Sequence, residues 1–250
     1  MSDDAAWFAA HGPEPELFEA ALRLARCDHP EADLASYRAH LEVLAASARN
    51  SEAPSPGEAL VAATAAEGYR GDTETYDDLA NANLIDVIER RRGLPVALGI
   101  LYIAAGRKAG WRMEGLSFPS HFLVRLEADR GRTIIDPFAG RIVADAEAEL
   151  APEHTAAVSD RAVLLRLVNN LRLRLLSSGR QETALSVVER TLWLAPDDPG
   201  LTAEAAEIEV GLGRIGGAIR RLEALDAMVR DGPIKRRVAT DLAQLRTRLN

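Results

Sequence analysis

The sequence has a single cysteine, no long hydrophobic run and an acidic start, and each of these features excludes a class of protein. Cys27 has no second thiol in the chain to pair with, so no intramolecular disulfide can form, and a reducing compartment fits. The longest uncharged apolar stretch, 94–106, is too short to span a bilayer. The first sixteen residues, MSDDAAWFAAHGPEPE, lack the apolar segment of a signal peptide. We therefore expect a cytoplasmic protein without a membrane partner.

Clustered positive charge is also scarce. The chain has 30 Lys and Arg residues against 38 Asp and Glu residues, and its formal net charge is −8. A nucleic-acid-binding protein needs a concentrated basic face, so we expect no nucleic-acid partner. The triplet Arg90-Arg91-Arg92 could hold an anion, but a solvated helix C-terminus explains it more simply. Cys27 and His29 lack the further ligands of a metal site, so we predict neither a metal nor a cofactor.

The residues that are abundant favour helix. Hydrophobic residues make up 47% of the chain, charged residues 27% and aromatic residues only 5%. Apolar side chains recur at helical spacing near the N-terminus, over 16–26, 33–49 and 57–68. A further helix is expected to begin after an N-cap at Asn81 or Asn83 and to end at Gly93. The next helix, 96–110, is apolar on nearly every side, so we expect it to lie buried in its domain, with Pro95 in its first turn.

The pattern changes to that of strands after Trp111. The stretches 121–128 and 132–136 are rich in β-forming residues, and Asp129-Arg130-Gly131 between them is typical of a hairpin. A two-residue turn would place His121 and Asp136 on the same face of the sheet as diagonal neighbours, whereas a three-residue turn would place them on opposite faces. Residues 140–143 could add a short third strand.

An internal repeat occupies the C-terminal part. Gly179-Arg180 recurs as Gly213-Arg214, Ala184 as Ala218, and Pro199 as Pro233, each after the same interval. A period of about 34 residues with these residue types at these places is the signature of tetratricopeptide repeats. We therefore predict helical repeats over 159–250, after a first domain over 1–158.

A set of motifs in the middle of the chain resembles the SirB-type branch of the transglutaminase-like superfamily. They are YDDLANANL (76–84), RRGLP (91–95), FPSHFLVR (118–125) and IDPF (135–138). The resemblance implies an α+β fold, in which a helix-rich, papain-like domain with a small antiparallel sheet precedes all-α tetratricopeptide repeats. It also implies that His121 and Asp136 stand where the family has a catalytic histidine and aspartate, and that a cysteine belongs near Pro95.

The sequence departs from catalytic members at that cysteine. Residues 93–99 read GLPVALG and offer no thiol or hydroxyl nucleophile. Ser120 would share a strand with His121 and point to the opposite face. We therefore expect a vestigial dyad, in a cleft lined by Asn83, Pro95, Phe118 and Ser120.

Three readings of the dyad follow. A buried histidine can donate to a carboxylate simply to satisfy both groups. The cleft can bind a peptide or another ligand, or the chain can have a hydrolytic or transfer activity of its own. The function predicted first is that of a noncatalytic protein- or peptide-interaction module that uses its repeats. The alternative is a hydrolase or acyl-transferase on a peptide or amide, with an unidentified nucleophile.

Overall fold

The computed structural model describes residues 2–12, 14–116, 118, 121–128, 131–143, 156–230 and 232–249. The chain forms two compact units. The central unit is Glu14–Leu167, and the repeat unit joins Met1–Pro13 to Val168–Asn250. The division into domains at 158 and 159 stays a proposal. No helix of the described ranges is both long enough and apolar enough to cross a membrane.

The central unit combines helices with a small antiparallel sheet, as predicted. Its helices are α2 (Leu17–Arg26), α3 (Leu34–Arg49), α4 (Pro56–Ala66), η1 (Leu79–Ala82), α5 (Leu84–Arg90) and α6 (Pro95–Lys108). The sheet has the order β6-β5-β4-β3-β7, and its strands are β3 (Arg112–Leu116), β4 (Leu123–Ala128), β5 (Gly131–Asp136), β6 (Arg141–Ile142) and β7 (Ala157–Val158). Two short parallel strands, β1 (Arg70–Gly71) and β2 (Arg92–Gly93), form a separate pair.

The hairpin has the register that a two-residue turn requires. Ala128 pairs with Gly131, and Val124 pairs with Ile135. The partner numbers therefore add to an odd total, as the two-residue turn requires. His121 precedes the paired residues of β4, so its place on the same face as Asp136 stays a prediction. The predicted third strand is β6, which pairs with the end of β5. The pairing of β3 with β7 was not predicted.

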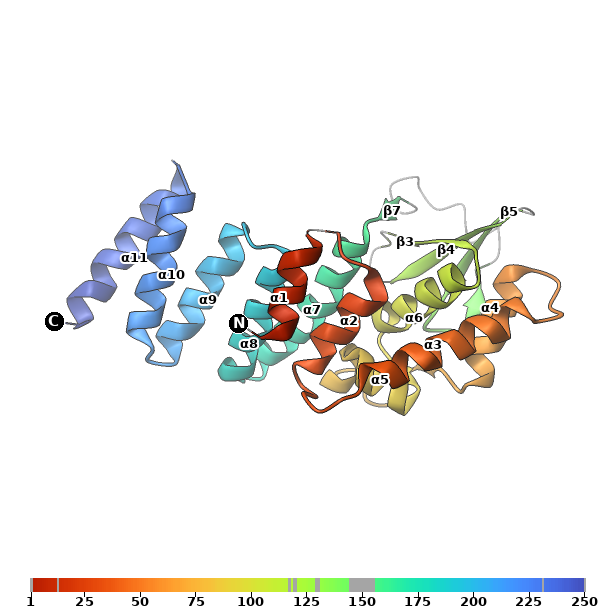
Figure 1. The fold of residues 1–250 in the computed structure, drawn as a ribbon. Helices are drawn as coiled ribbons and strands as arrows, with labels where there is room; N and C mark the ends of the chain where they lie inside the picture. The colour runs from red at the N-terminus through yellow and green to blue at the C-terminus, as the bar shows by residue number, and fades with distance from the viewer. Residues whose placement is uncertain are drawn as a thin grey trace. The chain divides into compact units, whose positions relative to one another are not determined.

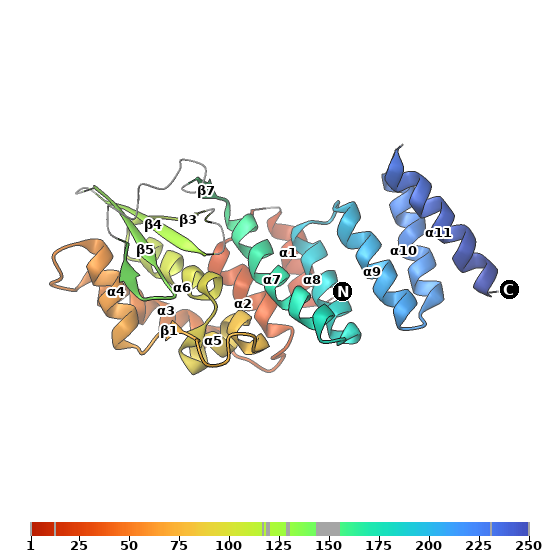
Figure 2. The same ribbon diagram turned by 180° about the vertical axis from the view of Figure 1, so that it is seen from behind.

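Helix α6 is the core of this unit, as its all-round apolar sequence predicts. Eleven of its residues, from Val96 to Gly106, are buried. It packs on the sheet, and α4 joins it through a hydrogen bond of 2.7 Å from Thr64 Oγ1 to the Tyr102 hydroxyl (Figures 1 and 2). Because α6 has no polar side to offer to water, burial against the sheet and the neighbouring helices is the arrangement that its sequence allows.

The repeat unit is built from helices alone. They are α1 (Asp3–His11), the end of α7 (Asp160–Ser177), α8 (Gln181–Leu194), α9 (Pro199–Gly211), α10 (Ile215–Met228) and α11 (Pro233–Leu249). Gly179 and Gly213 adopt positive φ angles of 70° and 73° in the turns before α8 and α10. Glycine adopts this conformation without steric cost, which explains why it recurs there. The 34-residue repeat is thereby confirmed.

The first helix of the chain belongs to the repeat unit, which the sequence did not indicate. Phe8 is 2% exposed, and its ring centroid lies 5.6 Å from that of Trp193 on α8. Trp7 stacks on His11 with the ring centroids 4.1 Å apart. The N-terminal segment thus covers part of α8 with aromatic side chains.

Ala184 and Ala218 stand at equivalent buried places, and both are fully inaccessible to solvent. Ala184→Leu and Ala218→Leu should each lower the free energy of unfolding by about 1–3 kcal/mol, because the helices there leave no room for a larger side chain. Chemical denaturation measures this directly. Ser186→Leu, on the exposed side of α8, is the matched control and should change stability little. Unaltered stability in both alanine variants would contradict this packing.

Candidate functional site

The start of α6 lies toward the end of the sheet where His121 and Asp136 are found. A Cβ atom added at Gly99 would lie 2.3 Å from Cε1 of Phe122, whereas one at Gly106 would meet Met113. The N-terminal half of α6 therefore packs where β4 begins, and its C-terminal half packs where β3 begins. Pro95 is one turn before Gly99 on the same side of the helix. The start of α6 and the residues His121 and Asp136 thus lie toward the same end of the sheet, where β4 begins and β5 ends.

His121 lies in a bend two residues before β4, and its side chain is exposed. Its ring centroid is 6.0 Å from that of Phe118, with the planes inclined by 47°. Its backbone carbonyl accepts a hydrogen bond of 2.7 Å from Nη2 of Arg166. The Arg166 guanidinium also lies 5.5 Å from the centre of the Phe122 ring. The backbone at His121 is therefore held in place, while the imidazole faces solvent.

Asp136 is the last residue of β5 and is half-buried. Its Oδ1 accepts hydrogen bonds from the backbone amides of Phe138, at 2.9 Å, and Ala139, at 3.0 Å. Burial raises the pKa of the Tyr102 hydroxyl above its ordinary value, and the negative charge of Asp136 raises it further. The carboxylate thus stabilises the turn after β5 and lies near α6.

The two residues share an end of the sheet but are not joined. Among the described residues, no hydrogen bond or ion pair links the His121 imidazole to the Asp136 carboxylate. The reading in which a buried histidine donates to this carboxylate is therefore wrong for this structure. The reason is local, because His121 lies in an exposed bend before the paired part of β4.

The first turn of α6 is formed by Pro95, Val96 and Ala97, none of which carries a thiol or a hydroxyl group. Pro95 is its first residue and is half-buried, while Val96 is 2% exposed and Ala97 is fully buried. Cys27 follows α2, where its thiol lies 3.5 Å from the Arg23 carbonyl oxygen in hydrogen-bonding geometry. No group of three potential metal ligands was found among the described His, Cys, Asp and Glu residues.

The other predicted cleft residues have different surroundings. Asn83 is 5% exposed and caps α5, because its Oδ1 accepts hydrogen bonds from the amides of Ile85 and Asp86. Its Nδ2 donates to the Ala25 carbonyl on α2 at 3.2 Å, so Asn83 serves as a brace between two helices. Phe118 is beside His121. Ser120 lies outside the described residues.

The arginine triplet braces the loop before α5. The Arg90 guanidinium lies 3.4 Å from a carboxylate oxygen of Asp72 and 3.3 Å from one of Asp78. Arg92 pairs with Glu74 at 3.0 Å. The three side chains are half-exposed at the C-terminal end of α5, as predicted, and Arg91 donates to the Ile88 carbonyl of its last turn. The carboxylate partners of Arg90 and Arg92 were not predicted. Helix α5 ends at Arg90 and not at Gly93 as expected, and its C-cap residue Arg91 has a positive φ of 58°.

Asp72 organises this loop, a role that the sequence did not predict. Its side chain is 1% exposed, and its Oδ1 accepts from the amides of Glu74 and Thr75 at 3.0 and 2.8 Å. The hydrogen bonds from Thr75 are the main reason why the pKa of Asp72 is lowered to about 2. The loop then reaches α6, since the Asn81 carbonyl accepts from the Leu94 amide at 2.8 Å. Asp72 thus supports the place where α6 begins.

Two further side chains lie beside the candidate site without a sequence signal. Tyr76 is 44% exposed, and its ring packs edge-on against Phe138 with centroids 6.0 Å apart. Arg166 comes from α7, beyond the motifs that carry the resemblance. An arginine within an ordinary amphipathic helix gives no indication that it will bind the His121 carbonyl, so only the structure identifies this contact.

Comparisons with known proteins agree with this geometry. A family model described as "Transglutaminase-like superfamily" matches residues 35–169, and one described as "Tetratricopeptide repeat" matches residues 171–250. A "UPF0162 protein" of Xylella fastidiosa strain Temecula1 is 34% identical over 172 residues, which is 62% of this chain and 61% of that protein. Another, from Vibrio cholerae, is 35% identical over 145 residues, 53% of this chain and 54% of that protein.

A eukaryotic protein is also similar over part of the chain. The mouse "F-box only protein 21" is 33% identical over 129 residues, which cover 46% of this chain and 20% of that protein. The matched part of the chain therefore spans about three-fifths of the Xylella protein, about half of the Vibrio protein and a fifth of the mouse protein.

Proposed function

Because the chain belongs to the transglutaminase-like superfamily and continues into tetratricopeptide repeats, we propose that it is a noncatalytic module that binds a protein or peptide. The observation that carries the proposal is the start of α6. Pro95, Val96 and Ala97 occupy its first turn, where the catalytic members resembled by this sequence have a thiol. A side chain without an ionisable or hydroxyl group at this position has no means of forming a covalent intermediate.

The surroundings of His121 support the same proposal. In a working triad the third residue orients the histidine by a hydrogen bond to its ring. Here the Asp136 oxygen accepts from two backbone amides, and the His121 ring is exposed. Tetratricopeptide repeats generally mediate contacts between proteins, so we assign the binding of the protein or peptide partner to the repeat unit.

The competing function is that of a hydrolase or acyl-transferase on a peptide or amide. One observation favours it, because His121 is accessible and belongs to the same end of the sheet as the start of α6. An accessible imidazole can activate water as a general base. In that case His121→Gln would remove turnover while the fold survives.

Restoring a thiol distinguishes the two functions. We expect a cysteine in the first turn of α6, introduced as Pro95→Cys or Val96→Cys, to have a pKa that depends on the helix N-terminus and not on His121. The reason is that no imidazole is held against that position to stabilise a thiolate. The rate of alkylation as a function of pH measures this pKa. Cys27→Ser serves as the background, so that a single thiol is observed.

The His121→Gln substitution in the same background is the control. Under our proposal it leaves the alkylation profile unchanged. A thiol whose pKa is clearly higher in the His121→Gln variant than in its parent would mean that the ancestral site is still assembled. The enzymatic function would then be favoured.

A further inference from the structure

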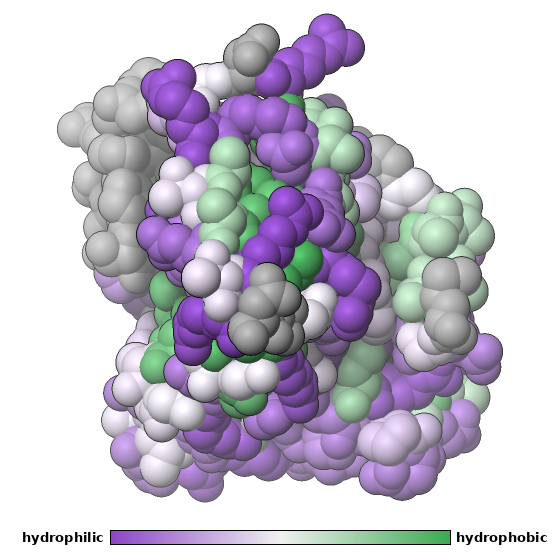
Figure 3. All heavy atoms as spheres, turned by 90° about the vertical axis from the view of Figure 1, so that its left-hand side faces the viewer, coloured by the Kyte–Doolittle hydropathy of each residue, from purple (hydrophilic) through white to green (hydrophobic). Residues whose placement is uncertain are grey.

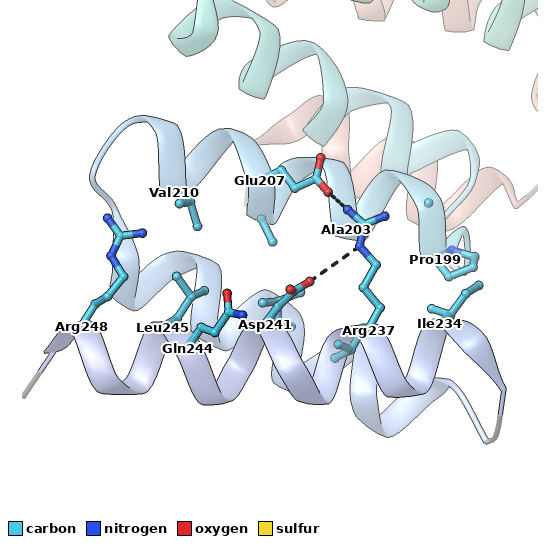
Figure 4. A pocket seen from close by; sticks show the side chains of 14 residues that line it. Pro199, Ala203, Glu207, Val210, Ile234, Arg237, Asp241, Gln244, Leu245 and Arg248 are labelled. Atoms are coloured by element: carbon cyan, nitrogen blue, oxygen red, sulfur yellow. Dashed lines mark hydrogen bonds and ion pairs between the residues drawn. The ribbon is translucent and has the colours of Figure 1, made fainter.

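Histidines are the side chains whose ordinary pKa, about 6.5, lies near neutral pH. Carboxylates and guanidiniums keep their charges in this range. An example is the repeat unit, where Arg237 pairs with Glu207 and approaches Asp241 at 3.8 Å (Figure 4). Hydrophilic side chains cover much of the face drawn in Figure 3. A response of the folded chain to pH near neutrality therefore depends on its histidines.

His40 on α3 differs from the other described histidines in its partner. His11 and His121 are exposed, and His29 lies 3.1 Å from a carboxylate oxygen. His40 is half-buried, and its Nε2 lies 2.8 Å from the hydroxyl of Tyr69. Tyr69 is 6% exposed. Within the described ranges, His40 is thus the histidine that is bonded to a buried neutral side chain.

Arg91 binds the same hydroxyl, and this determines which atom carries the proton. Its Nη1 donates to the Tyr69 oxygen at 2.9 Å, and its Cζ lies 4.9 Å from the centre of the Tyr69 ring. A phenol has a single proton, and burial raises the pKa of Tyr69 so that the proton stays on it. Among the described residues the His40 Nε2 is the acceptor for that proton. His40 is therefore neutral, with its own proton on Nδ1.

Arg91 also holds the backbone between α5 and β2. In the described part of the chain it is the one non-glycine residue with a positive φ angle. Such a conformation persists where surrounding contacts hold it, and here the side chain binds the Ile88 carbonyl and approaches Glu67 at 3.6 Å. The Arg91 carbonyl accepts from the Arg70 amide at 3.1 Å, which joins β2 to β1. Two residues after β2 the chain enters α6.

We propose that His40, Tyr69 and Arg91 form a proton-sensitive latch, which opens when His40 binds a proton and then loosens the β1–β2 pair that leads into α6. A proton on the His40 Nε2 points at the phenol, so the phenol proton loses its acceptor. Two positive charges then flank one hydroxyl. The guanidinium is the group that leaves, because Glu67 and solvent can take it, whereas α3 holds the imidazole. This response to pH is separate from the proposed binding function and does not depend on it.

The charges around His40 agree with this direction. Burial lowers the pKa of His40, the charge of Arg91 lowers it further, and the weaker effect of Glu67 at the end of α4 opposes both. Two further charged groups reach α3 from α5 and α6 and are engaged with other partners, Glu89 with the Tyr37 hydroxyl at 2.6 Å and Lys108 with Glu42 at 2.7 Å.

The pH range of the latch follows from the lowered pKa of His40. A histidine whose pKa is lowered by folding binds fewer protons in the folded chain than in the unfolded one. Its contribution to stability is full above the ordinary pKa of about 6.5 and declines as the pH falls from there to the folded pKa. Asp72, whose pKa is about 2, titrates far below this range.

NMR spectroscopy of the full chain with isotope-labelled histidine tests the bonding. We expect a neutral His40 with its proton on Nδ1 at about pH 8, and a pKa below about 6.5. Arg91→Asn should raise that pKa, because it removes the guanidinium and keeps a residue that tolerates the left-handed conformation. Arg70→Asn removes an exposed charge next to Tyr69 that does not act on the pKa of His40, and should shift it less.

Hydrogen exchange tests the opening of the latch. The amides of Arg70 and Asp72 donate to carbonyls at or beside β2. As the pH falls from about 7.5 to 5.5, their protection, corrected for the intrinsic exchange rate, should fall by up to about tenfold for each unit by which folding lowers the pKa of His40. His40→Gln can accept the Tyr69 proton without titrating and should abolish this fall. His11→Gln, at an exposed position, should keep it.

Three results would overturn the inference. They are a neutral His40 with its proton on Nε2, a His40 pKa that Arg91→Asn leaves unchanged, and amide protection that is constant with pH in the parent or falls equally in His40→Gln. The first needs only the parent chain, in which contacts with the Tyr69 ring identify the His40 resonances. The inference is therefore testable even if a variant fails to fold.

Discussion

Asp72→Ala should lower the free energy of unfolding by about 3 kcal/mol, because it removes the buried carboxylate that organises the exposed loop 73–78. The carboxylate accepts from the amides of Glu74 and Thr75 and from the Thr75 hydroxyl, and it pairs with Arg90. Without it these donors are left unsatisfied beside a part-buried guanidinium. Urea unfolding followed by circular dichroism measures the loss. Glu74→Ala removes an exposed carboxylate of the same loop and should cost less than about 1 kcal/mol.

The same residue makes stability depend on pH. The pKa of Asp72 is about 2 in the folded chain, below its ordinary value of 3.8. A carboxyl whose pKa is lowered by folding contributes its stabilisation above the unfolded pKa and loses it as the pH falls through the folded pKa. The difference in stability between the parent and Asp72→Ala should therefore be full above about pH 4 and shrink toward about pH 2. A difference that is constant over this range would contradict the assignment.

Gly99→Val should destabilise the chain by about 3 kcal/mol, because the position has no space for any side chain. An added Cβ atom would lie 2.3 and 2.4 Å from two atoms of the Phe122 ring, which is 1% exposed and has nowhere to move. The smaller change Gly99→Ala should already destabilise. Thermal and chemical denaturation measure both variants.

Gly106→Ala is the matched control on the same helix. Its Cβ would approach Met113 Cγ and Sδ at 2.7 Å, but a methionine side chain can adopt another rotamer. The gain in helix propensity from glycine to alanine, up to about 1 kcal/mol, offsets much of that adjustment. We therefore expect Gly106→Ala to be nearly neutral. Equal costs for the two alanine variants would show that contact with Phe122 does not decide the packing of α6.

Much of the fold could be predicted because local patterns determine it. The apolar sequence of α6 allows only burial, and the short connection between β4 and β5 determines their register. Gly179 and Gly213 mark the repeat because their backbone conformation favours glycine. These features depend on a few neighbouring residues, which a single sequence displays.

The rest of the site depends on residues far apart in the chain. Whether Asp136 reaches His121 or the turn amides is decided by side-chain placement, which no spacing encodes. Arg166 meets His121 only after the chain has passed through the whole sheet. The bracing role of Arg90 requires Asp72, which precedes the recognised motifs. The elements of the site can therefore be predicted from the sequence, whereas the pairing of its polar groups cannot.

The contact of Phe8 with Trp193 has a consequence for how the chain folds during synthesis. Helix α1 leaves the ribosome before the central unit, and the helix that receives it is completed only after the entire central unit has been translated. At typical elongation rates of ~5–20 residues per second, this delay is on the order of 10–40 s. During that time Trp7 and Phe8 lack their final packing partners and can contact chaperones or other nascent chains. The repeat unit therefore closes late, in a step whose loop entropy is large.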